Sequence, residues 1–135
     1  MTVSAAPCGR PAPRILIVED EFLIAMALED MLLAMGYAVV GIATTYETAV
    51  ALAAEKRPAL VLMDIRLASE RDGIDAAIEI HRTLCVPSLF TLANIDPDNM
   101  DRAKAAIPAG WVPKPYSPEV INEAVAEALR QTGQP

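Results

Sequence analysis

The segment Ala-Leu-Val-Leu-Met-Asp at residues 59–64 and the segment Arg-Ile-Leu-Ile-Val-Glu-Asp-Glu at residues 14–21 decide the fold. Each is a short apolar run, without polar alternation, that ends on carboxylates. Runs of this kind are typical of strands buried on both faces, as in parallel sheets. Because the carboxyl ends of parallel strands lie at one edge of a sheet, we expect Glu19, Asp20 and Asp64 to gather there.

Short apolar runs alternate with helical patterns along the rest of the chain. The predicted strands cover residues 15–18, 38–43, 59–63, 87–92 and 111–113, and the predicted helices cover residues 21–35, 46–56, 73–84, 97–107 and 118–131, the last capped by Ser117. This alternation predicts an α/β fold, a parallel sheet covered by helices on both faces. Right-handed crossovers favour the flavodoxin-like, doubly wound (βα)5 order 2-1-3-4-5. In that order strands one and three are neighbours, so the acidic residues meet at the switch point where such sheets bind ligands.

Composition bounds the class of protein. The 135 residues predict one domain at residues 14–131, a disordered leader at residues 1–13 and a tail at residues 132–135. The net charge of −7 disfavours nucleic acid as a direct partner. No apolar run reaches membrane-spanning length, and the leader lacks a signal-peptide core, so we expect a cytoplasmic location without membrane contact. The two cysteines lie in dissimilar settings, which predicts no disulfide, with Cys85 as a small core residue.

The three carboxylates predict a cation site. Crowded carboxylates raise one another's pKa unless a cation joins them, and an all-oxygen site suits Mg²⁺. We expect Asp20 and Asp64 as direct ligands and Glu19 as a ligand directly or through water, with the backbone carbonyl of Arg66 as another oxygen. Beside Mg²⁺, the carboxylate of Asp64 is a candidate nucleophile that would attack phosphorus and form an acyl phosphate.

A lysine near the end of the chain completes this prediction. Lys114 follows the last short apolar segment and precedes Pro115, which holds its backbone extended. Its ammonium would neutralise charge on the oxygens of a transferred phosphoryl group.

These segments resemble the receiver domain of two-component response regulators. The resemblance covers residues 14–130 and rests on Ile-Leu-Ile-Val-Glu-Asp-Glu at 15–21, Leu-Val-Leu-Met-Asp-Ile-Arg-Leu at 60–67, Asp-Gly-Ile at 72–74 and Lys-Pro-Tyr at 114–116. It implies that Asp64 accepts the phosphoryl group, that Glu19 and Asp20 hold Mg²⁺, and that Lys114 contacts the phosphate. It also implies a phosphohistidine donor on a sensor histidine kinase or phosphotransfer protein. Such a domain is a signalling phosphoacceptor that assists its own phosphorylation and dephosphorylation, not a conventional enzyme.

The sequence departs from this family at the switch. Receivers usually carry Thr or Ser at the end of strand four, whose hydroxyl couples the phosphoryl group to an aromatic residue on strand five. Here Leu92 and Trp111 occupy these positions. Thr91 lies one residue earlier, which puts its side chain on the opposite face. Either a bulge restores the hydroxyl, or Asn94 substitutes, or the coupling is missing. We expect phosphorylation to be retained with a weakened or altered readout.

The expected output is protein binding. A complete chain of this length would be a single-domain regulator, and a part of a longer chain would come from a hybrid kinase or larger regulator. We expect a downstream partner, or a second copy in a homodimer, on the face of the fourth helix, fifth strand and fifth helix. The residues predicted for this face are Met100, Trp111, Tyr116 and Val120.

Three rival functions remain at this point. The first is a pseudo-receiver, an interaction module that keeps the fold without phosphorylation, which the missing hydroxyl favours. The second is a phosphohydrolase of the haloacid-dehalogenase type, which needs an Asp two residues after the nucleophile, where this chain has Arg66. The third is a flavin-binding module, which needs a phosphate-cradling loop after the first strand, where this chain is acidic.

Overall fold

The computed structural model describes residues 12–132. The predicted leader lies outside the described residues except for Ala12 and Pro13, as does the predicted tail except for Thr132. The strands are β1 (Arg14–Val18), β2 (Ala38–Ala43), β3 (Leu60–Asp64), β4 (Ser88–Leu92) and β5 (Gly110–Pro113). The helices are α1 (Phe22–Ala34), α2 (Tyr46–Lys56), α3 (Gly73–Leu84), α4 (Pro97–Arg102), the 3₁₀ turn η2 (Ala103–Ala106) and α5 (Pro118–Gln131).

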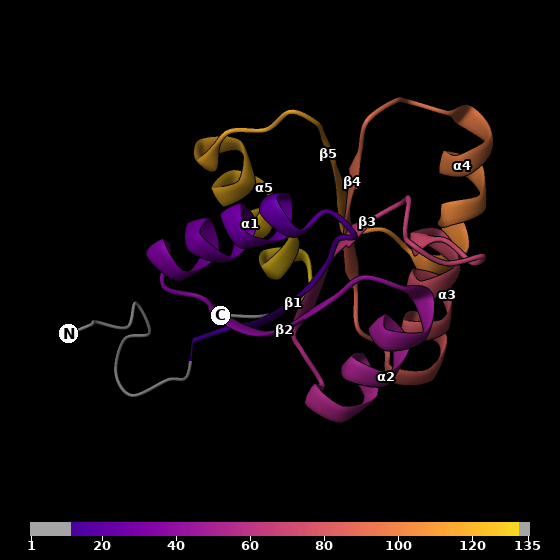
Figure 1. Cartoon of the computed structure of the whole chain (residues 1–135), viewed down its shortest axis with the longest axis horizontal. Helices are drawn as coiled ribbons and strands as arrows, with labels where there is room; N and C mark the ends of the chain where they lie inside the picture. Colours follow the sequence, from indigo (N-terminus) through magenta and orange to yellow (C-terminus); the bar gives the residue numbers. More distant parts are fainter. Residues whose placement is uncertain (1–11, 133–135) are drawn as a thin grey trace.

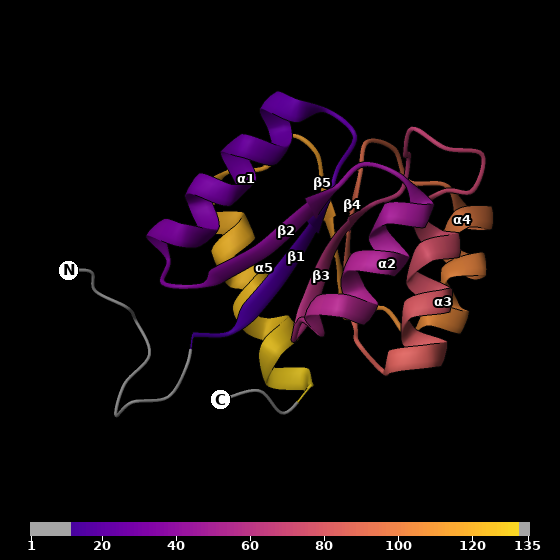
Figure 2. The same cartoon turned by 60° about the horizontal axis from the view of Figure 1, so that its bottom comes forward.

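The predicted doubly wound sheet is confirmed. The strands pair in parallel in the order β2-β1-β3-β4-β5. Helices α1 and α5 cover one face, and α2, α3 and α4 lie on the other (Figures 1 and 2). Strands β1 and β3 are neighbours at the centre, so the ends that carry the acidic residues meet as expected.

Two apolar layers hold the helices to the sheet. One cluster, here called the α2–α3 cluster, joins the sheet to α2, α3 and η2. The other, here called the α1–α5 cluster, joins the sheet to α1 and α5. Successive residues of a strand serve alternate layers: Leu89 packs in the α1–α5 cluster and Phe90 in the α2–α3 cluster. All residues of β3 and β4 are buried, which is why these strands are mainly apolar without polar alternation; Asp64, Ser88 and Thr91 are the buried polar exceptions.

Helix boundaries follow local capping. Thr45 and Asp72 form capping boxes at the starts of α2 and α3, and Ser117 caps α5 as predicted. Gly36, with a φ of 92°, follows the end of α1. Cys85 ends α3 in the left-handed conformation and is exposed, so its prediction as a small core residue was wrong. The C-terminal position of a helix faces solvent here, although its sequence neighbours are apolar.

The fourth helix is shorter than predicted. A single helix was expected at residues 97–107, but α4 ends at Arg102 and the chain tightens into η2. Ala103 and Ala106 are both buried, and a 3₁₀ turn brings residues three apart onto one side. No residue of α4 itself is buried. The sheet therefore holds this segment through two alanines and not through a continuous apolar face.

None of the helices between residues 12 and 132 is long and apolar enough to cross a membrane.

Candidate functional site

The acidic residues predicted from the sequence do meet at the carboxyl edge of the sheet. Val18 is paired with Met63, so the residues that follow on β1 and β3 are adjacent. Glu19, Asp20 and Asp64 each offer a carboxylate oxygen, and these atoms lie within 4.8 Å of one another. Glu19 and Asp64 are buried, whereas Asp20 is exposed. This all-oxygen donor set, open on one side, is suited to Mg²⁺.

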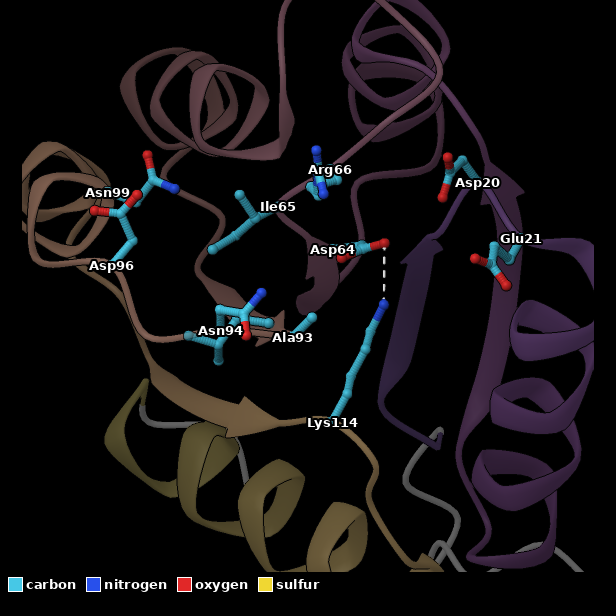
Figure 3. Close-up of a pocket in the computed structure, with 11 residues that line it drawn as sticks. Asp20, Glu21, Asp64, Ile65, Arg66, Ala93, Asn94, Asp96, Asn99 and Lys114 are labelled. Atoms are coloured by element: carbon cyan, nitrogen blue, oxygen red, sulfur yellow. Dashed lines mark ion pairs between the residues drawn. The ribbon is translucent and has the colours of Figure 1, made fainter.

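Lys114 lies against two of these carboxylates. Its Nζ is 3.2 Å from Asp64 Oδ2 and 3.4 Å from Glu19 Oε1 (Figure 3 draws the pair with Asp64). The backbone N–H of Lys114 donates to the carbonyl of Leu92 at 2.8 Å, which continues the pairing of β5 with β4. The peptide bond from Lys114 to Pro115 is cis. A residue far along the chain from Asp64 is thus placed beside it by the sheet itself.

The acidic cluster carries more negative than positive charge, and this shifts the pKa values of Glu19 and Lys114. Burial, followed by the charge of Asp64, raises the pKa of Glu19 to about 7. Burial alone would lower the pKa of Lys114, but the charges of Asp64 and Glu19 outweigh it and raise that pKa. The cluster therefore holds three carboxylates but only one ammonium, which pairs with Glu19 and Asp64, and ionising Glu19 near neutral pH is unfavourable without a further cation.

A pocket of about 600 Å³ opens over Asp64. One side is formed by Asp20 and Glu21, and the opposite side by the β4–α4 loop and α4 (Figure 3). Its remaining lining residues are Ile65, Arg66, Leu92, Ala93, Asn94, Asp96, Asn99 and Lys114. The side chain of Arg66 is exposed at its rim.

The switch positions divide between the two faces of β4. Leu92 lines the pocket and packs in the α2–α3 cluster. Thr91 is buried and pairs with Asp64 in the sheet, but alternation places its side chain on the face of Leu89. β4 pairs with β3 and β5 without a register shift, so no bulge brings the Thr91 hydroxyl to the pocket.

Of the other two switch residues, Asn94 lines the pocket and Trp111 does not. Trp111 is half-buried and stacks on Phe90, with ring centroids 4.9 Å apart and an interplanar angle of 22°. Leu92, Phe90 and Trp111 all contribute to the α2–α3 cluster. Trp111 thus keeps an aromatic ring on β5, while the apolar side chain of Leu92 stands where the family resemblance implies a hydroxyl.

The sequence analysis gave Gly73 no role beyond the start of a helix and the Asp-Gly-Ile motif, yet the structure leaves no room for a side chain at this position beside Asp64. A Cβ on Gly73 would lie 1.8 Å from the carbonyl oxygen of Asp64. The N–H of Gly73 donates to the carbonyl of Ile65 at 2.7 Å. The start of α3 thus packs directly on the backbone that carries Asp64. The Asp-Gly pair was the available signal, but its spatial neighbour was not readable from the sequence.

Helix α1 carries an exposed apolar surface that the sequence did not predict. It exposes Phe22, Leu23, Met26 and Leu33, with Leu23 80% exposed. A groove of about 550 Å³, here called the α1 groove, is lined by Leu23, Ile24, Ala27, Met31, Lys114, Pro115 and Tyr116. Of the face predicted for partners, Val120 is exposed, while Met100, Trp111 and Tyr116 are half-buried. Lys114 lines both the α1 groove and the Asp64 pocket.

Comparison with known proteins agrees with this geometry. Residues 15–126 match the family model of the response regulator receiver domain. The chain is 40% identical over 119 residues to the phyllosphere-induced regulator PhyR of Methylorubrum extorquens, covering 87% of this chain and 44% of that protein. It is 42% identical over 116 residues to the transcriptional regulatory protein PdtaR of Mycobacterium tuberculosis, covering 86% and 56%. The chain thus spans about half the length of these curated relatives.

A solved structure shows the same fold. The signal receiver domain of a modulated diguanylate cyclase from Desulfovibrio desulfuricans superposes with a TM-score of 0.84 at 31% identity, over 90% of this chain and 97% of that one. The sheet order, the acidic cluster at its carboxyl edge and these matches lead to one assignment. The chain belongs to the response regulator receiver domain family of two-component signalling systems.

Proposed function

We propose that Asp64 accepts a phosphoryl group from a phosphohistidine of a sensor histidine kinase or phosphotransfer protein. The observation that carries this proposal is the position of Lys114, whose Nζ lies 3.2 Å from Asp64 Oδ2 and 3.4 Å from Glu19 Oε1. A carboxylate oxygen of Asp64 attacks phosphorus, and the P–N bond to histidine breaks with its electron pair going to the imidazole nitrogen. The product is an aspartyl phosphate, and its hydrolysis regenerates the carboxylate.

Mg²⁺ is part of this proposal because the residues fit it. The carboxylates of Asp20 and Asp64 would hold the ion, with Glu19 directly or through water and the backbone carbonyl of Arg66 as a further oxygen. When bound, Mg²⁺ supplies positive charge that offsets the negative charge on the phosphoryl oxygens. Two of the three clustered carboxylates are buried beside a single lysine, so the cluster itself favours a divalent cation.

Lys114 supplies the protein's own positive charge. Its ammonium is placed by β5 and ion-paired to Asp64 before any phosphoryl group arrives. Because Lys114 lies beside the carboxylate that gains the phosphoryl group, it can pair with a phosphoryl oxygen without moving far. A charge that is positioned in advance needs little reorganisation during transfer.

The α1 groove supports a protein donor. A phosphohistidine reaches Asp64 only if its protein covers the carboxyl edge of the sheet. Phe22 and Leu23, exposed at the start of α1, directly follow Asp20 and Glu21 at that edge, and the α1 groove shares Lys114 with the pocket. We infer that the donor packs on α1 while its histidine enters the pocket. The predicted downstream surface and homodimer on α4, β5 and α5 remain separate proposals, as do the cytoplasmic location and the absence of direct nucleic-acid contact.

A pseudo-receiver remains the second candidate, because Leu92 places a buried alkyl side chain at the pocket instead of a hydroxyl. In that case the fold would bind its partner equally well with or without a phosphoryl group. The two candidates make opposite predictions for the chemistry of Asp64 and for the signal at Trp111.

One experiment separates them. The protein is incubated with acetyl phosphate and Mg²⁺, and the intact mass is measured for the native chain, Asp64→Asn and the matched control Asp98→Asn, an exposed residue of α4. We expect a single phosphoryl adduct that requires Mg²⁺, is lost in Asp64→Asn and is kept in the control. An adduct that survives Asp64→Asn, or no adduct on the native chain, would contradict the proposal.

The readout is measured in parallel. Beryllofluoride, a phosphoryl mimic, is titrated in the presence of Mg²⁺ while the fluorescence of Trp111 is recorded. A saturable change that is absent in Asp64→Asn would mean that the signal reaches β5 despite Leu92. An adduct by mass without a change at Trp111 would mean that phosphorylation and the usual coupling are separate in this chain.

A further inference from the structure

Helix α4 forms one wall of the Asp64 pocket, yet the core holds it weakly. Asp96, which caps α4, and Asn99 within it both line the pocket (Figure 3). None of the residues of α4 is buried. The apolar anchoring of this segment lies beyond the helix, in Ala103 and Ala106 of η2. The position of α4 therefore depends on polar contacts more than that of any strand facing the pocket.

One arginine makes most of those contacts. Arg102, the last residue of α4, places Nη2 2.5 Å from Asp72 Oδ2 and Nη1 3.2 Å from Asp75 Oδ1. Nη2 also donates to Asn99 Oδ1 at 3.3 Å. Among residues 12–132, these are the only side-chain ion pairs that join α4 to an element outside the α4–η2 segment. Arg102 thus links the pocket-lining Asn99 to helix α3.

The partners of Arg102 are themselves fixed. Asp72 and Asp75 form the capping box of α3, in which each side chain accepts a hydrogen bond from the other's backbone N–H. The residue after Asp72, Gly73, packs on the backbone of Asp64. The start of α3 is therefore a rigid anchor next to the nucleophile. A planar guanidinium that bridges two carboxylates is a geometrically specific contact, unlike a single exposed ion pair.

We propose that Arg102 is a positioning residue for phosphoryl chemistry at Asp64: by tying α4 to the capping box of α3, it holds the α4 wall of the pocket in place beside Asp64 and limits the access of water to it. Releasing Arg102 lets α4 move outward, gives water more access to Asp64 and shortens the life of an aspartyl phosphate. The chain would thereby regulate its phosphorylated state through an ionic contact on α4, at a site where it lacks the usual strand-four hydroxyl. The lifetime part of this inference rests on the proposed function; the positional part does not.

The positional part is tested by amide hydrogen exchange of the unphosphorylated protein, followed by NMR. The reporter amides are Met100, bonded to the carbonyl of Asp96, and Ala103, bonded to that of Asn99. We expect Arg102→Gln to speed their exchange by about threefold to tenfold, since a partly exposed ionic contact contributes modestly to local stability. Amides in the centre of α5 should be unchanged. Unchanged exchange at Met100 and Ala103 would overturn the proposal.

A matched control variant and a double-mutant cycle of Arg102 with Asp72 test whether the effect is specific or a general effect of charge. Lys104→Gln removes the ion pair between Lys104 and Asp101, which lies in the same segment at 3.1 Å but does not reach α3. The amides of Met100 and Ala103 should therefore exchange at the same rate in this variant as in the native chain. Asp72→Asn removes one carboxylate partner and keeps a residue suited to N-capping. If Arg102 acts through Asp72, the double variant should exchange little faster than either single variant. Fully additive effects would contradict that route.

The lifetime part is tested by the loss of the phosphoryl adduct after the donor is removed. We expect Arg102→Gln and Asp72→Asn to shorten the half-life by about threefold to tenfold, in line with the change in α4 opening, and Lys104→Gln to leave it unchanged. If the native chain carries no adduct on Asp64, the proposed function fails and the exchange result stands alone. If the adduct forms and its half-life is unchanged in Arg102→Gln, the positioning role fails and the proposed function stands.

Discussion

The two walls of the Asp64 pocket are built by different physical means. One wall lies at the ends of strands that pack in the apolar core: Asp64 ends β3 and Lys114 follows β5, while Glu19, which follows β1, contacts Lys114 from behind the pocket lining. On the other, α4 has no buried residue and is tied to α3 by Arg102. Most of the residues that would perform chemistry are held by the packing of the strands that carry them, which depends little on salt. The residues around them are held by exchangeable polar contacts, which makes that wall the natural place for change.

The largest expected effect on the strand side of the pocket is a loss of stability on substitution of Gly73, which packs on the backbone of Asp64. A methyl group at this position would overlap the carbonyl oxygen of Asp64, at 1.8 Å, and backbone atoms cannot move aside as a side-chain end can. We expect Gly73→Ala to lower the free energy of unfolding by about 3 kcal/mol or more. Urea denaturation measures this, and Gly41→Ala is the control, because its Cβ would make an ordinary 3.4 Å contact with Leu52. Equal stabilities of the two variants would mean that α3 does not pack on Asp64 as described.

Glu19 makes the stability of the folded protein depend on pH. Its pKa is raised from 4.5 to about 7 in the folded protein, so between these values the folded state binds more protons than the unfolded state. The free energy of unfolding should therefore fall as the pH rises from about 4.5 to 7, by about 3 kcal/mol at 1.36 kcal/mol per pKa unit.

The measurement is urea denaturation at several pH values in EDTA, with Glu19→Gln as the control that should lose this slope. Mg²⁺ favours the ionised carboxylate, so we expect it to flatten the slope in the native chain and to bind more tightly as the pH rises through about 7. A slope that is the same in Glu19→Gln would assign the pH dependence to other groups.

Lys114 distinguishes metal binding from phosphoryl transfer. Lys114→Gln removes the positive charge 3.2 Å from Asp64, so we expect the rate of phosphorylation by acetyl phosphate to fall by about 100-fold. Mg²⁺ affinity should not fall, because the carboxylates lose a competing cation. Lys104→Gln, at an exposed lysine, should leave both quantities unchanged. Loss of Mg²⁺ binding in Lys114→Gln would instead indicate that the lysine organises the whole cluster.

The smallest expected effect is at Leu92, where the two walls meet. A hydroxyl in Leu92→Thr would add one hydrogen bond to a phosphoryl group, worth about 1 kcal/mol, and should strengthen the fluorescence response of Trp111 to beryllofluoride. Thr91→Val changes a hydroxyl on the opposite face and should leave that response as it is in the native chain. An unchanged response in Leu92→Thr would mean that the apolar path through Phe90 and Trp111 already carries the signal.

The sequence predicted the fold well because its strands are mainly apolar and most of its helices begin with a capping side chain. The helices predicted at residues 46–56 and 73–84 have the same bounds in the structure, where Thr45 and Asp72 cap their starts. The prediction failed where packing overrides pattern. In α1, apolar residues occur all around the helix, so the pattern could not show that Phe22 and Leu23 stay exposed while Ala25 is buried. At residues 103–106, buried alanines converted a predicted helix into a 3₁₀ turn.

The sequence by itself determined the parallel sheet, the acidic cluster at its edge and the identity of Asp64 and Lys114 as a candidate pair, because these follow from residue type, strand order and the polarity of parallel strands. Only the tertiary structure decided how close Gly73 lies to Asp64, how Arg102 joins α4 to α3, and which face of α1 meets solvent. Those three facts depend on how separate helices and strands pack against one another. Local propensity and spacing carry no information about such contacts, which arise only when the whole core is packed.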